Sequence, residues 1–199
     1  MITRPALVAA GVGLFTAAAA AQTFSYNEFI DGDLSGDIAA PTDLGATGVG
    51  INSVRLTVEN SALPGGDFDV FTFQIQDGQE LAAIILEDYL SPDGVSFIAF
   101  DDAPTFPVNP NTGDPFAFAG GALFGTDVQG IGGDILPDLL TPTAGGSGFV
   151  GPVGPGSYSF FVQQTGELTE LQLGFVVIPA PGSAALLLIA GVAGVRRGR

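Results

Sequence analysis

The side chains of this chain that could do chemistry are almost all carboxylates. The sequence has 21 Asp and Glu residues against five Lys and Arg, and it contains no His and no Cys. Nucleophilic sites of the Ser-His-Asp and Cys-His types need a His, and so does a His-ligated zinc site. All five cations are Arg, so Schiff-base chemistry has no Lys amine to use. Carboxylate pairs are the only acid–base groups that remain.

Two such pairs are adjacent in the sequence, Glu87-Asp88 and Asp101-Asp102. A carboxylate pair can hydrolyse a glycosidic bond when one group donates a proton and the other attacks or activates water. Adjacent residues on a strand, however, point to opposite faces of the sheet. We therefore predict no catalytic residue and no enzymatic activity.

The charge distribution separates the ends of the chain from its body. The ends hold four of the five cations, which are Arg4, Arg196, Arg197 and Arg199. Residues 22–178 hold all 21 acidic residues and only Arg55, so their formal charge is near −20 (one positive against 21 negative). Nucleic-acid binding is excluded because it needs clustered Lys and Arg. The carboxylates either form a solvated surface, or a few of them converge on a hard cation such as Ca²⁺, which takes oxygen ligands.

The first residues have the pattern of an export signal. Arg4 precedes an apolar run of small residues, and Ala19-Ala20-Ala21 offers the small side chains that a signal peptidase selects. A buried amphipathic helix is the alternative, but the run has no polar face of helical period. We predict a signal helix over residues 1–21 that is removed before Gln22, and hence an exported protein.

The last residues, 179–199, have the pattern of a membrane-held sorting tag. Apolar residues 184–195 would span about 18 Å as a helix, less than the roughly 30 Å of a bilayer core. Short apolar tails of this kind are commonly removed by a processing enzyme. Pro179-Ala180-Pro181, Leu186-Leu187-Leu188 and the terminal Arg196, Arg197 and Arg199 resemble a PEP-CTERM sorting signal in a Pro-Ala-Pro variant. The resemblance implies an exosortase-type enzyme as partner and transient insertion of a transmembrane helix in the inner membrane. The alternatives are a plain tail anchor and a last core strand with a basic end.

Between these ends, residues 22–178 have the size and pattern of one all-β domain. Apolar and polar side chains alternate in residues 54–58, 69–76, 158–162 and 171–177, as in half-buried strands. Residues 81–86 and 95–100 are more continuously apolar, as in strands buried on both faces. Turn clusters rich in Gly, Pro and Asp separate the strands, so we predict an antiparallel β-sandwich. The Gly- and Pro-rich residues 101–156 are expected to form a partly structured excursion with a short strand at residues 116–119.

The order of these elements resembles the bacterial pre-peptidase C-terminal domain, a β-sandwich of jelly-roll type. The matching motifs are an acidic segment at residues 27–37, a Gly-Asp-x-Asp-x-Phe-x-Phe pattern at residues 66–73 and a closing hairpin at residues 156–173. Some members of that family bind Ca²⁺ between the acidic segment and the Gly-Asp-x-Asp strand. The resemblance therefore implies a Ca²⁺ site with Glu28, Asp31, Asp33, Asp67 and Asp69 as ligands. An acidic surface loop that leads into a strand is the alternative.

Two non-enzymatic functions fit these observations. The first is a structural protein of the cell envelope or extracellular matrix, associated with exopolysaccharide and sorted through its tail. The second is a Ca²⁺-dependent module that binds a glycan or a protein through a face of the sandwich or through residues 101–156. Aromatic side chains exposed on one face would favour the second function.

Overall fold

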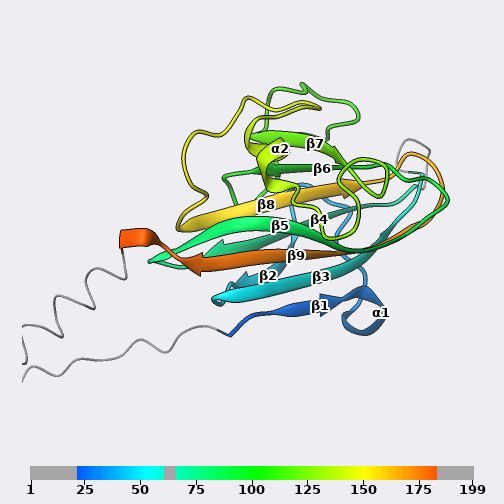
Figure 1. Cartoon of the computed structure of the whole chain (residues 1–199). Helices are drawn as coiled ribbons and strands as arrows, with labels where there is room; N and C mark the ends of the chain where they lie inside the picture. The colour runs from blue at the N-terminus through cyan, green and yellow to red at the C-terminus, as the bar shows by residue number, and fades with distance from the viewer. Residues whose placement is uncertain (1–21, 61–65, 183–199) are drawn as a thin grey trace, which may run out of the picture.

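The computed structural model describes residues 22–60 and 66–182. The predicted signal helix, the apolar part of the tail and the three C-terminal arginines lie outside these residues. The chain is mostly β, with 47% strand and 7% helix, and its strands form two sheets. The predicted all-β, two-sheet architecture is thereby confirmed (Figure 1).

The strands divide into a four-stranded sheet A and a five-stranded sheet B. Sheet A has the order β1 (Ser25–Asn27), β3 (Gly50–Val58), β9 (Thr169–Pro179), β5 (Gln79–Leu90). Sheet B has the order β2 (Thr42–Ala46), β4 (Phe68–Ile75), β8 (Gly156–Gln163), β6 (Ser96–Asp101), β7 (Gly120–Phe124).

Most of the pairing is antiparallel, as predicted, but the two N-terminal edge strands are exceptions. Strand β1 runs parallel to β3, and β2 runs parallel to β4. The prediction of a purely antiparallel sandwich was therefore wrong at these two edges. The cause is the connection: β1 and β2 are joined through α1 (Glu28–Asp31) and an irregular loop that crosses from sheet A to sheet B, not by a hairpin within one sheet.

The core lies between the sheets and is aromatic at its centre. The period of two along β4 places Phe71 and Phe73 on its inner face, where both contact the buried Phe160 of the neighbouring β8. Phe175 of β9 reaches the same group from sheet A, with its ring centroid 5.0 Å from that of Phe160. Contacts of this kind across the two sheets hold the fold without any disulfide, since the sequence has no Cys.

Residues 101–156 form a cover for the sandwich, and their strand lies later than predicted. Residues 116–119 are not a strand; β7 begins at Gly120. The reason is a turn at Asp114, whose carboxylate accepts the Phe116 N–H and whose carbonyl oxygen accepts the Ala117 N–H. At the start of β7, a Cβ at Gly120 would lie 2.1 Å from the carbonyl oxygen of Leu139, so only glycine lets α2 (Leu136–Leu140) pack against β7. Phe116 is 67% exposed, whereas Phe118 packs with Phe106 on the outer face of sheet B.

The same excursion covers the free edges of β5 and β7. The Gly132 N–H donates to Leu86 O, and the Ile135 N–H donates to Ile84 O, each at 2.8 Å. On β7, Gly121 O accepts from residues 143 and 144. Segments far apart in the sequence thus close one side of the sandwich, and the buried Ile135 fills the space between the sheets.

The prediction of strands buried on both faces is confirmed for β6 and wrong for β5. On β6, Ala99 is buried on the outer face and Ile98 on the inner face. On β5, Leu86 is buried but Ala82 is exposed and Ile85 only half-buried. The difference arises because Phe106 and Phe118 of the excursion pack on the part of the outer face of sheet B that contains Ala99. The outer face of sheet A around Ala82 and Ile85 has less cover.

Both ends of the described chain lie at the same end of the sandwich (Figure 1). Gly50, at the start of β3, pairs with Val177 near the end of β9, and a Cβ at Gly50 would touch Thr23. Helix α1 lies at the opposite end, beside the last residues of β3. Within residues 22–60 and 66–182, no helix has the length and apolar character needed to cross a bilayer.

Candidate metal centre

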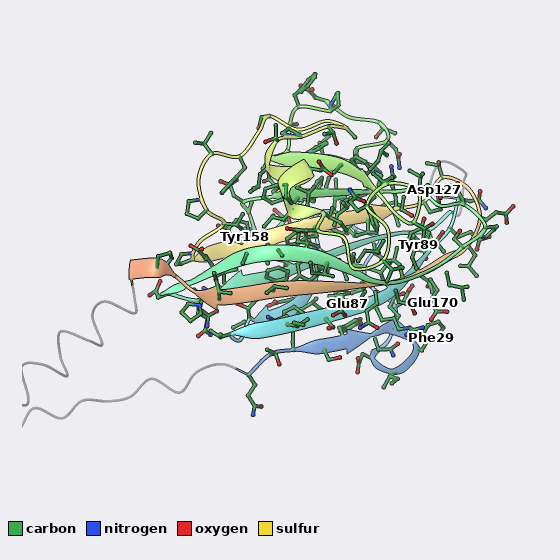
Figure 2. The ribbon with its side chains drawn as sticks, viewed as in Figure 1. Phe29, Glu87, Tyr89, Asp127, Tyr158 and Glu170 are labelled. Atoms are coloured by element: carbon green, nitrogen blue, oxygen red, sulfur yellow. The ribbon has the colours of Figure 1, made fainter. Side chains whose placement is uncertain are left out.

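Three carboxylates meet at the end of the sandwich where α1 lies. One oxygen each from Glu28, Asp33 and Asp69 lies within 4.8 Å of the others. Figure 2 marks this end by Phe29, the second residue of α1, whose side chain is 65% exposed. Glu28 and Asp33 come from the N-terminal segment and Asp69 from β4, so the cluster joins two parts of the chain that are distant in sequence.

Local hydrogen bonds shape the N-terminal part of the cluster. Asn27 caps α1 by accepting the Phe29 N–H, and its own N–H donates to Asp31 Oδ2 at 2.8 Å. Gly32 ends the helix with a φ of 105°, a conformation that favours glycine. The Tyr26 hydroxyl donates to Gly32 O at 2.7 Å, which folds the loop back onto β1.

Glu28 is held from two directions. Its Oε1 accepts the Leu34 N–H at 2.9 Å, and its Oε2 accepts both the N–H and the hydroxyl of Thr57 at 2.6 and 3.1 Å. Burial raises the pKa of Glu28, while these hydrogen bonds oppose the rise. Thr57 was not among the predicted site residues, because nothing in its sequence surroundings shows that β3 ends beside α1.

Asp69 is the least expected member, since it lies among core residues. It occupies the inner face of β4, two residues before Phe71, and has no exposed surface. Neither of its carboxylate oxygens has a hydrogen-bond partner within the described part of the chain. Burial, and then the charges of Glu28, Asp67 and Asp33, raise its pKa to about 10.

The other two predicted ligands, Asp67 and Asp31, stand outside the group of three. Asp67 precedes β4 and is close enough that burial and the charges of Asp33, Glu28 and Glu59 raise its pKa to about 6. Asp31 instead completes the cap of α1 and lines a separate cleft with Tyr26 and Asp43. The structure thus brings together Glu28, Asp33 and Asp69, with Asp67 beside them.

The donor set fits a hard divalent cation. All the donors are carboxylate oxygens, the ligands that Ca²⁺ prefers, and the sequence has no His imidazole and no Cys thiolate. Ca²⁺–oxygen distances are about 2.3–2.6 Å, so oxygens on opposite sides of one ion lie about 4.8 Å apart. The spacing of the three oxygens matches that geometry. Water and Asp67 could supply further ligands.

The adjacent pair Glu87-Asp88 departs from the expected arrangement. The register of β5 against β9 shifts between Leu86 and Asp88, so Glu87 is the extra residue of a β-bulge. Both acids consequently lie on the outer face of sheet A, where Glu87 accepts from Ser53 and Asp88 approaches Arg55 (Figure 2 labels Glu87). The expectation that they point to opposite faces was wrong, because a bulge breaks the period of two.

The predicted sorting motif begins inside the sheet. Pro179 is the last residue of β9 and pairs with Gln79, and the Ala180 N–H donates to Gly78 O at 2.8 Å. Pro181 and Gly182 form the start of a helical turn, and Arg196, Arg197 and Arg199 lie outside the described residues. The motif therefore leaves the domain directly from a strand end.

Compared with models of known protein families, with curated proteins and with solved structures, the chain gives no match. The carboxylate cluster and the position of the chain ends are therefore the observations that bear on function. The cluster can bind a cation. Residues 179–182 show that the C-terminal tail emerges at the end of the sandwich opposite the cluster.

Proposed function

We propose that this chain is an exported, non-catalytic protein of the cell envelope or extracellular matrix, associated with exopolysaccharide, whose β domain binds Ca²⁺. The observation that carries the proposal is Asp69, a fully buried carboxylate without a hydrogen-bond partner in the described chain. A carboxylate in such a place must either be protonated or bind a cation. Extracellular modules bind Ca²⁺ with dissociation constants of about 10⁻⁴–10⁻³ M, so Ca²⁺ at millimolar concentration would occupy such a site.

The role proposed for the ion is structural. Glu28 follows β1 of sheet A and is bonded to Thr57 of β3, whereas Asp69 belongs to β4 of sheet B. An ion between them would tie the N-terminal segment to both sheets. It would also relieve the repulsion among carboxylates that have no Lys or Arg within the cluster.

Sorting through the C-terminal tag, by an exosortase-type enzyme at the inner membrane, is the second part of the proposal. Residues 179–182 emerge from β9 at the end of the sandwich away from the carboxylate cluster, which supports access of a membrane enzyme to the tag (Figure 1). We also propose a fold of jelly-roll type. Its support is that β3, β4, β5 and β6 alternate between sheets A and B.

Calcium-dependent melting tests the structural role. We expect about 10 mM CaCl₂, roughly 100 times a Kd near 10⁻⁴ M, to raise the melting temperature above that in EDTA, because a ligand that binds only the folded state adds about 2.7 kcal/mol at 100 times its Kd. At roughly 2–4 °C per kcal/mol, the rise should be about 5–10 °C. Asp69→Asn should abolish it. Asp77→Asn, an exposed change in the turn between β4 and β5, is the matched control and should retain it.

Equal melting curves of the wild type in CaCl₂ and EDTA would remove the ion from the proposal, as would an undiminished rise in Asp69→Asn. Export and sorting are tested separately, by intact-mass spectrometry of the native protein. We expect a chain that begins near Gln22 and lacks the terminal arginines. A native chain with Met1 and Arg199 both present would contradict that part alone.

A further inference from the structure

A row of side chains crosses the outer face of sheet B near the end where the carboxylate cluster lies. The register pairs Phe68 of β4 with Gln163 of β8, Gln163 with Phe97 of β6, and Phe97 with Leu123 of β7. Side chains paired in this way point to the same face of a sheet. Phe97 is half-buried and Leu123 is 46% exposed, so these two neighbouring side chains present apolar surface to solvent and form a floor.

Two loops form a wall beside this floor. Asp93 and Val95 come from the loop between β5 and β6, and Thr165 comes from the turn between β8 and β9. Together with Phe97, Leu123 and Gln163 they line a cleft of about 310 Å³. That volume is at the lower end of the range for small-molecule sites, which suits one or two sugar rings.

Hydrogen bonds within the protein hold the two loops of the wall in place without a ligand. The buried Gln164 side chain donates to Val95 O at 2.8 Å and accepts the Thr165 N–H at 2.7 Å, which joins the two loops. The Asp93 carboxylate accepts the Val95 N–H at 3.2 Å, and the Tyr89 hydroxyl donates to Asp93 O at 3.0 Å. A cleft that is held open in this way costs little ordering entropy on binding.

The chemistry of the cleft selects for a neutral, polyhydroxylated ligand. The Phe97 ring and the Leu123 side chain form the apolar part of the floor, and the Asp93 carboxylate and the hydroxyl of the exposed Thr165 lie beside it. Sugar rings have an apolar C–H face that packs on such a floor and hydroxyls that bond to such a rim. Anionic ligands are disfavoured by Asp93 and by a chain whose formal charge is −16.

We infer that the cleft over Phe97 and Leu123 is a binding site for neutral sugar units of a polysaccharide. The inference rests on the proposed extracellular function, which brings the protein into contact with such polymers, and it names the class of ligand that the site takes. The residues of this cleft come from the outer face of sheet B and from the β5–β6 and β8–β9 loops, and none of them belongs to the carboxylate cluster. The candidate cation site and the sugar site are thus separate surfaces at one end of the molecule.

Affinity electrophoresis of the purified chain tests the site, with galactomannan, xyloglucan or dextran in the gel and alginate as an anionic comparison. We expect at least one neutral polymer, but not alginate, to retard the wild type, in CaCl₂ and in EDTA alike. Leu123→Asp places a charge on the exposed floor and should weaken binding about tenfold or more, since a lost contact of 1.4 kcal/mol is tenfold in affinity. Phe97→Ala should do the same.

Val150→Asp, at a side chain that is 99% exposed and outside the cleft, is the control and should bind as the wild type does. The melting temperature of Leu123→Asp should equal that of this control, which separates lost binding from lost folding. Absence of retardation by all three neutral polymers would overturn the inference, and so would equal retardation of wild type and Leu123→Asp. Neither result would bear on the calcium-dependent melting or the intact-mass spectrometry, which test the proposed function separately.

Discussion

Asp69 occupies a position of β4 that the period of two assigns to the core. Phe71, Phe73 and Ile75 continue the same face and are buried among other apolar side chains. At the end of this row the core meets the N-terminal loop, and there the strand carries a carboxylate. A buried charge is tolerated at such a place only if a proton or a cation accompanies it.

This arrangement predicts how stability depends on pH when calcium is removed. The folded-state pKa values of Asp67 (about 6) and Asp69 (about 10) lie above the unfolded value, near 3.9. The folded state therefore binds more protons, and its extra stability is complete below about pH 4 and is lost as pH rises through 6 and towards 10. We expect the melting temperature in EDTA to fall between pH 4 and pH 8.

Circular-dichroism melts at each pH measure this dependence. The Asp69→Asn variant serves as the control, because its side chain cannot ionise and its melting temperature should fall less over the same interval. Saturating CaCl₂ should also reduce the fall, since the ion binds the ionised carboxylates. A wild type and an Asp69→Asn variant with the same slope in EDTA would contradict the account given for Asp69.

The excursion between β6 and β8 covers one side of the sandwich. It adds β7 to sheet B, places α2 against β7 and bonds its own backbone to β5. Close backbone approach makes this possible, and Gly120 is the position where the approach is tightest. The role of the excursion in the structure is therefore to protect one side of the sandwich.

A Gly120→Ala substitution tests this role. The added methyl group would meet Leu139 O at 2.1 Å and Phe100 at 2.6 Å, so the helix would have to move away from β7. Overpacking of this kind costs about 1–3 kcal/mol, and we expect a lower melting temperature by about 2–4 °C per kcal/mol. Gly154→Ala is the matched control, because a Cβ there meets nothing within 4 Å. Two variants equally stable in denaturant titrations would show that α2 does not pack against β7 as described.

The whole molecule is dominated by one sign of charge. Arg55 is the single cation among residues 22–178, and it is already bonded to Glu170 on the outer face of sheet A. Both side chains are still partly exposed, Arg55 at 33% and Glu170 at 25%, and one ion pair open to solvent is worth little against the repulsion of the remaining carboxylates. Net repulsion of this size should destabilise the compact state more than the unfolded one.

We therefore expect salt to stabilise the protein. Raising NaCl from 0.1 M to 1 M in EDTA shortens the Debye length from about 10 Å to about 3 Å and should raise the melting temperature. Choline chloride, whose cation is too large for a carboxylate cluster of this spacing, should give the same rise if screening is the cause. A melting temperature that stays constant or falls with NaCl would contradict the role assigned to net charge.

Some of the candidate site could be predicted from sequence and some could not. The acidic residues of the N-terminal segment and of the β4 entry stand out because carboxylates flank glycines there. Which of them converge depends on the crossing of the chain between sheets, and Asp31 is diverted into the cap of α1. Thr57 and the row of Phe97, Gln163 and Leu123 carry no local signal, because each depends on pairing between distant strands.

The amino-acid sequence determined strands β3–β6, β8 and β9 and the all-β class of fold, because alternation and composition are local properties of the chain. Tertiary structure alone decided the parallel edge strands, the bulge at Glu87 and the place of β7, since these depend on backbones that meet from far apart in the sequence. It also decided that Asp69 is buried beside Glu28 and Asp33. A strand's own pattern fixes which face a side chain takes, but only packing fixes what that face meets.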